Sequence, residues 1–177
     1  MTPLAIEADD PRYPLRLRQR LAADAPPELT VLGSLELLSR PMTALFCSAR
    51  CPGKAILRTY DQAAKWRDEG RVIISGFHSP VEKECLGILL RGSQPIIICP
   101  ARSLDGMRVP PEWGPHIDSA RLLLLSIFGP AVRHATAETA RRRNEFVASL
   151  ADEIHIAYAS PGGHLEKLRL HSTPHEV

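Results

Sequence analysis

The sequence predicts a single α/β domain of the doubly wound, Rossmann-like kind, with a mainly parallel sheet of five or six strands. Five short runs of nearly continuous apolar residues recur along the chain, as expected of strands that are buried on both faces. Segments with helical periodicity separate them, and repeated strand–helix–strand units imply right-handed crossovers. The five runs are ALFCS (44–48), RVIIS (71–75), PIIIC (95–99), RLLLLSIF (121–128) and EIHIAY (153–158).

The N-terminal residues add elements to this core without forming a second domain. A helix is predicted over about 13–22, and LTVLG (29–33) is expected to be an edge strand. No internal repeat or low-complexity segment divides the 177 residues. We therefore expect an extension of the domain over 1–40, a Rossmann-like core over 41–170 and a flexible tail over 171–177.

Helix signals fill the links between the predicted strands. The segment 54–69 carries an apolar stripe and is followed by Gly70, a typical helix terminator. Ser79-Pro80-Val81-Glu82 is a capping box with proline at the first helical position, and it opens a helix that runs to about Arg91. A short helix is expected near 115–120, and a longer one begins at Thr136.

Composition excludes several classes of protein. The chain is 44% hydrophobic and 24% charged, which is typical of a globular domain, and no stretch approaches the roughly 20 apolar residues that cross a membrane. The N-terminus is acidic and lacks a long apolar region, so we expect no signal peptide and a cytoplasmic location. The four cysteines form no CxxC pair and are expected to be buried thiols rather than metal ligands. Neither a metal nor a cofactor is predicted.

The net charge of +2 does not by itself indicate a nucleic-acid partner. The distribution of the cations is more informative, because Arg141, Arg142 and Arg143 form a run. From charge alone, such a run is more typical of a solvated helix face than of an anion-binding one.

Candidate ligand contacts follow the predicted strands, because doubly wound sheets bind ligands outside the carboxyl ends of their strands. After the first run, Ser48, Arg50 and Lys54 lie in a loop of small residues that leads into a helix. Free backbone N–H groups and two cations there suit an anion. The spacing fits neither the dinucleotide-binding motif nor the P-loop, and a tight turn with two surface charges remains the alternative.

Two more loops of small residues occupy equivalent positions. Ser75 and Gly76 follow the second run, and Gly162 and Gly163 follow the fifth. All three loops are expected to meet in one crevice. The helix before the fifth run adds its own candidates: Arg142 and Arg143 are predicted to contact phosphate, and Asn144 to orient a loop or a base.

The order of these motifs resembles the Rossmann-like domain of the DNA-processing protein DprA (Smf) family over about residues 11–168. The family's YP-x-x-L segment is similar to the chain around Tyr13-Pro14, and LYVLGNLELL is similar to 29–38. The motifs VGSR and VVSGLA are similar to 47–50 and 73–78. The motif RNR is similar to 143–145, and the glycine-rich segment after the last strand to 158–163.

This resemblance implies binding of single-stranded DNA, homodimerisation and a part in DNA processing or recombination. The composition, for its part, predicts no membrane association. The chain departs from the family pattern at Ser48, which replaces a glycine, and at Glu145, which replaces the second arginine of RNR. We therefore expect a divergent relative in which Arg50, Lys54, Arg142 and Arg143 hold phosphates.

A sister family, the LOG-type phosphoribohydrolases, supports an alternative function as a nucleotide-binding protein or nucleoside-monophosphate phosphoribohydrolase. The motif P-G-G-x-G-T-x-x-E of that family is similar to the chain from Pro161 onward, but Arg169 stands at the position of the catalytic glutamate. Glycosidic hydrolysis needs a carboxylate beside the ribose. No residue is therefore predicted to be catalytic, and the sequence favours a binding protein over an enzyme.

Overall fold

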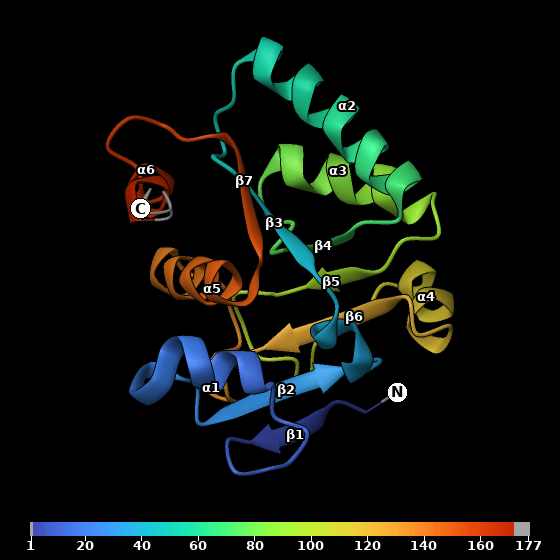
Figure 1. Cartoon of the computed structure of the whole chain (residues 1–177), viewed down its shortest axis with the longest axis vertical. Helices are drawn as coiled ribbons and strands as arrows, with labels where there is room; N and C mark the ends of the chain where they lie inside the picture. Colours follow the sequence, from blue (N-terminus) through green and yellow to red (C-terminus); the bar gives the residue numbers. More distant parts are fainter. Residues whose placement is uncertain (1, 172–177) are drawn as a thin grey trace.

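The computed structural model describes the backbone of residues 2–171 and the side chains of residues 2–168. Seven strands form one sheet in the order β1-β2-β6-β5-β4-β3-β7 (Figure 1). Strands β3 to β7 are mutually parallel, whereas β2 is antiparallel to both β1 and β6. The strands are β1 (Leu4–Glu7), β2 (Glu28–Leu32), β3 (Met42–Cys47), β4 (Val72–Ser75), β5 (Ile96–Ile98), β6 (Leu122–Ser126) and β7 (Glu153–Tyr158).

Helices cover both faces of this sheet (Figure 1). On one face lie α2 (Gly53–Glu69), α3 (Pro80–Leu90) and the short α4 (Gly114–Asp118). On the other lie α1 (Leu15–Leu21), α5 (Ala137–Leu150) and α6 (His164–His171). From β3 the chain runs through β4 and β5 to β6, connected by the helices α2, α3 and α4. Helix α5 then returns it to β7, which lies on the other side of β3. This reversal of direction confirms the doubly wound, Rossmann-like fold and puts the carboxyl ends of β3 and β7 beside the switch point.

Local signals explain where most elements begin and end. Every residue of β3, β4, β5 and β6 is buried, as their continuous apolar runs predict. Helix α3 begins with the predicted capping box, since the Ser79 hydroxyl accepts from the Glu82 N–H and the Glu82 carboxylate accepts from the Ser79 N–H. Helix α2 ends at Gly70, whose φ of 69° is the left-handed conformation that glycine adopts at low cost.

The strand count differs from the prediction. The sheet has seven strands rather than five or six, because Leu4–Glu7 forms the unpredicted strand β1. The segment expected to be an edge strand, now β2, is therefore enclosed between β1 and β6. Only Ile6 of β1 is buried, so no apolar run marked it in the sequence. The proposed tail 171–177 lies outside the described residues, apart from the backbone of His171.

No helix among residues 2–171 has the length and apolar character needed to span a bilayer.

A carboxylate ties the N-terminal helix to the core. Asp152, just before β7, accepts hydrogen bonds from the Met42 N–H at 2.9 Å and from Arg16 at 2.7 Å, and Arg20 lies 3.4 Å away. Both arginines also donate to carbonyls at the end of α5. Partial burial raises the pKa of Asp152, but these hydrogen bonds and the two cations outweigh it, and the pKa is lowered below 3.8.

We predict that D152N lowers the free energy of unfolding by about 1 kcal/mol at neutral pH, the usual net value of such hydrogen bonds. Because the folded-state pKa is depressed, the contribution of the carboxylate is fully present above the unfolded value of 3.8 and is lost as the pH falls through the folded-state value. Urea unfolding of both proteins at several pH values measures it. A difference that does not shrink in acid would contradict the assignment.

Candidate crevice at the carboxyl ends of the parallel strands

The loops that follow β3 and β7 are joined to each other. The Ser48 N–H donates to the Tyr158 carbonyl at 2.9 Å, and the Ser48 hydroxyl accepts from the Ser160 N–H at 3.0 Å. Ser48, the residue that replaces a family glycine, thus uses its side chain to hold the second loop against the first. The structure brings these two predicted loops together.

Two cations stand beside this junction. Arg50 and Lys54 are exposed, and neither forms an ion pair or a side-chain hydrogen bond with the residues that the structure describes. Lys54 lies in the first turn of α2, whose N-terminus has no side-chain cap. Uncapped N–H groups and unpaired cations make this corner electropositive.

The buried Glu82 side chain holds the end of β3 and the loop after β4 in place. It is 5% exposed, and its two carboxylate oxygens accept three backbone hydrogen bonds. One comes from the Cys47 N–H at the end of β3 at 2.8 Å. The others come from His78 at 2.8 Å and Ser79 at 3.1 Å, in the loop after β4. A single buried side chain therefore fixes the ends of two neighbouring strands.

Arg143 is not among the exposed cations, contrary to the expectation of a free phosphate ligand. It is 4% exposed, donates from Nη1 to the Cys99 carbonyl at 2.8 Å, and donates from Nε to the Asn144 side-chain oxygen at 2.8 Å. Burial lowers the pKa of its guanidinium, while the charge of Glu82 acts to raise it. Arg143 supports the strand-end loops from inside the protein, and the carbonyl oxygen of the Asn144 side chain accepts a hydrogen bond from that guanidinium.

The loop after β4 is shaped around this arginine. A Cβ atom at Gly76 would lie 1.4 Å from Arg143 Nη1, so only glycine leaves room for the guanidinium. Ser75 is fully buried, and its hydroxyl accepts from the Phe77 N–H at 3.1 Å. Ser75 and Gly76 therefore shape the loop around Arg143, and the space beside Gly76 is filled by the Arg143 guanidinium.

The glycine loop before α6 is also partly occupied. Gly162, with a φ of 71°, donates its N–H to the Glu166 carboxylate at 2.7 Å. The Gly163 N–H donates to the Ser160 carbonyl at 2.9 Å. In the predicted anion-binding loop, the Gly162 N–H is therefore already bonded to a carboxylate of the same chain, because the Glu166 side chain points back toward the loop.

Arg142 occupies a separate position on α5. Its side chain is exposed, and its guanidinium carbon lies 5.5 Å from the centre of the Phe128 ring, a cation–π contact beyond the end of β6. Of the ten predicted contacts, the loop residues and Arg143 gather around β3, β4 and β7, whereas Arg142 faces the α1 side. The predicted contacts are Ser48, Arg50, Lys54, Ser75, Gly76, Arg142, Arg143, Asn144, Gly162 and Gly163.

The cysteines add no further ligand set. Cys47, Cys85 and Cys99 are buried as predicted, and Cys51 is half-buried. Burial raises the pKa of the Cys85 and Cys99 thiols to about 12, so both are protonated at neutral pH. Within the described part of the chain, no group of three or more histidine, cysteine or acidic residues is arranged to hold a metal ion.

The contact between Gly76 and Arg143 is testable. G76A forces the guanidinium out of its place, and such overpacking costs about 1 to 3 kcal/mol. Gly87, in the middle of α3, is a matched control because no atom lies within 4 Å of an added Cβ. We expect G87A to stabilise the protein by about 0.5 to 1 kcal/mol, the usual gain from replacing a helical glycine. Urea unfolding compares the two, and equal effects would contradict the packing described.

Comparison with known structures supports the same architecture. DNA processing protein A (DprA) from Streptococcus pneumoniae matches with a TM-score of 0.73 and 22% identity, covering 94% of this chain and 59% of that one. DNA processing protein A from Helicobacter pylori, solved in a study of its single-stranded DNA binding mode, matches with a TM-score of 0.67 and 22% identity. That match covers 88% of this chain and 69% of the other. At these identities the likeness concerns the fold.

A search of curated proteins found no match. The family model for DNA recombination-mediator protein A, in contrast, matches residues 5–169, which is nearly the whole chain. The resemblance inferred from the strand-end motifs is therefore confirmed, and this chain belongs to the DNA recombination-mediator protein A family.

Proposed function

We propose that this protein binds single-stranded DNA as part of DNA processing or recombination, with the strand's phosphates held at the carboxyl edge of the sheet. The observation that carries the proposal is the pair of exposed cations Arg50 and Lys54, which have no ion-pair partner in the described part of the chain, beside a helix N-terminus without a side-chain cap. Membership of the family supports it, as does the Helicobacter pylori structure, which was solved in a study of single-stranded DNA binding.

The contacts are assigned according to exposure. Arg50, Lys54 and Arg142 are exposed and reach phosphates directly. Arg143 acts indirectly by supporting the loops, since its guanidinium donates hydrogen bonds to the Cys99 carbonyl and the Asn144 side chain. The Ser48 and Gly162-Gly163 loops line the path of the backbone. Homodimerisation and a cytoplasmic location complete the proposal, on the strength of the family resemblance.

Binding of this kind is chiefly electrostatic. Only 5% of residues are aromatic, so stacking platforms are few. Neutralising phosphates releases counterions, and the logarithm of the affinity then falls linearly with the logarithm of the salt concentration. Three phosphate contacts give a slope of about −2 for a single strand.

We expect fluorescence anisotropy with labelled oligonucleotides to detect binding that weakens with this slope. Arg50→Ala and Lys54→Ala combined should flatten the slope by about 1.4, because two phosphate contacts are lost. Lys65→Ala is the matched control, since Lys65 is also an exposed cation on α2 but pairs with Glu69 near the opposite end of the helix. Absence of binding at about 50 mM salt would refute the proposal.

No observation favours the phosphoribohydrolase alternative. Glu166, the carboxylate nearest the glycine loop in sequence, accepts the Gly162 N–H at 2.7 Å. A carboxylate in that hydrogen bond closes a turn of its own chain, whereas glycosidic hydrolysis needs one beside the ribose. The position of the catalytic glutamate in the LOG-type motif is Arg169, whose side chain lies outside the described residues.

Phosphoribohydrolase activity is tested directly by incubation with each nucleoside monophosphate, followed by chromatography for free base. We expect no base above the level in a protein-free control. Release of base by the wild type that disappears in E166Q would instead establish the enzyme activity and displace the DNA-binding proposal.

A further inference from the structure

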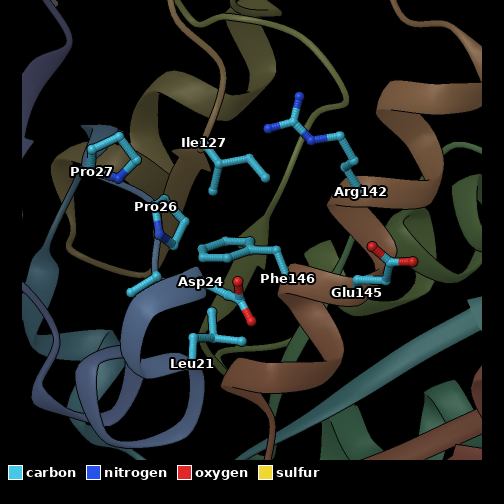
Figure 2. Close-up of a pocket in the computed structure, with 9 residues that line it drawn as sticks. Leu21, Asp24, Pro26, Pro27, Ile127, Arg142, Glu145 and Phe146 are labelled. Atoms are coloured by element: carbon cyan, nitrogen blue, oxygen red, sulfur yellow. The ribbon is translucent and has the colours of Figure 1, made fainter.

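A second recess lies on the same edge of the sheet, beyond the end of β6. It encloses about 420 Å³ between α5 and the segment that joins α1 to β2 (Figure 2). Pro26, Ile127 and Phe146 provide apolar surface, and Figure 2 shows Pro26 and Ile127 beside the Phe146 ring. Its volume lies within the usual range of small-ligand pockets.

The recess and the crevice share one edge because of the strand pairing. β2 is antiparallel to β6, and Thr30 is paired with Ser126. The residues that precede β2, including Pro26, therefore lie at the carboxyl end of β6. The N-terminal half of α5 adjoins both places, since Arg143 reaches the loop after β4 while Arg142 lines the recess.

Charged groups around the recess complement a nucleotide. Arg142 is exposed and forms no ion pair among the residues that the structure describes. Asp24 also lines the recess, is exposed, and has no ion-pair partner in the same part of the chain. Glu145 is the other carboxylate there, and Arg141 neutralises it at 2.9 Å. Among the described residues, one cation and one carboxylate, neither in an ion pair, thus flank an apolar hollow.

We propose that this recess holds one base of the bound strand, which deepens the proposed function and rests on it. The base packs against Pro26, Ile127 and Phe146, while Arg142 contacts the adjoining phosphate. The Asp24 carboxylate is an acceptor only, so it binds the exocyclic amino group of cytosine, adenine or guanine. Thymine has no such group, and its one donor, the N3–H, lies between two carbonyl oxygens that repel the carboxylate, so it is the disfavoured occupant.

The first test fills the recess. Ala25 lines it, whereas Ala23 in the preceding turn is exposed and does not, so A25W and A23W are a matched pair. We expect A25W to weaken binding of an oligonucleotide about tenfold, within the range for losing one stacked base, and A23W to leave it unchanged. An abasic deoxyribose-phosphate strand, which has no base to lose, should bind A25W and wild type equally.

The second test changes no packing. Wild type should bind oligo(dC) more tightly than oligo(dT) by about five- to tenfold, the effect of one charge-assisted hydrogen bond. D24N should abolish this preference, because the amide that replaces the carboxylate lacks its charge. Circular dichroism and thermal unfolding of each variant verify that it is folded.

The outcomes separate the two proposals. If wild type binds intact and abasic strands equally well, or if A25W binds like A23W, the base site is refuted and electrostatic strand binding stands. If wild type binds neither strand at low salt, the proposed function itself fails. Equal binding of oligo(dC) and oligo(dT) by wild type would overturn the role of Asp24.

Discussion

The buried carboxylate of Glu82 is the interaction on which the carboxyl edge of the sheet depends. Strands in a parallel sheet end with backbone N–H groups that have no further partner in the ladder, and each such group is costly to bury alone. Glu82 satisfies one of them, at Cys47 in the last position of β3, and two further buried N–H groups, of His78 and Ser79, in the loop after β4. The same carboxylate thereby caps α3, fixes the loop after β4 and anchors the end of β3.

The same carboxylate makes Arg143 tolerable in the interior. An unpaired buried cation is strongly unfavourable, and nearby negative charge together with hydrogen bonds offsets that cost. Arg143 has both, from the charge of Glu82 and from the carbonyl of Cys99. The fold thus places two buried groups of opposite charge, Glu82 and Arg143, beneath the strand-end loops and keeps the cations Arg50 and Lys54 at the surface.

Most of the fold was predictable because buried parallel strands leave continuous apolar runs, as β3 to β6 do. β7 also spans the predicted residues 153–158, but the expectation that it is buried on both faces was wrong, because it is an edge strand and none of its residues is fully buried. β1 was not, because its pairing with β2 is a tertiary contact that its four residues do not encode locally. The loops of the candidate site were predictable from their position after strands. The burial of Arg143 was missed because it sits in a run of arginines, although its spacing from Val147 and Leu150 puts it on the inward stripe of α5. The recess beside Phe146 joins segments distant in sequence, so no local pattern marks it.

The hydrogen bond between Glu166 and the Gly162 N–H has a consequence for selectivity. Any anion that arrives at this amide competes with a carboxylate held in place by its own backbone, at an effective concentration on the order of millimolar. The phosphate of a free mononucleotide competes with that carboxylate at only its bulk concentration. Under the proposed binding mode, a phosphate in a strand whose neighbours are held at Arg50 would also be tethered, and it would compete with the carboxylate on more equal terms. That binding mode therefore predicts that the loop favours polymeric over monomeric phosphates, because the Glu166 carboxylate is always present as a competing anion.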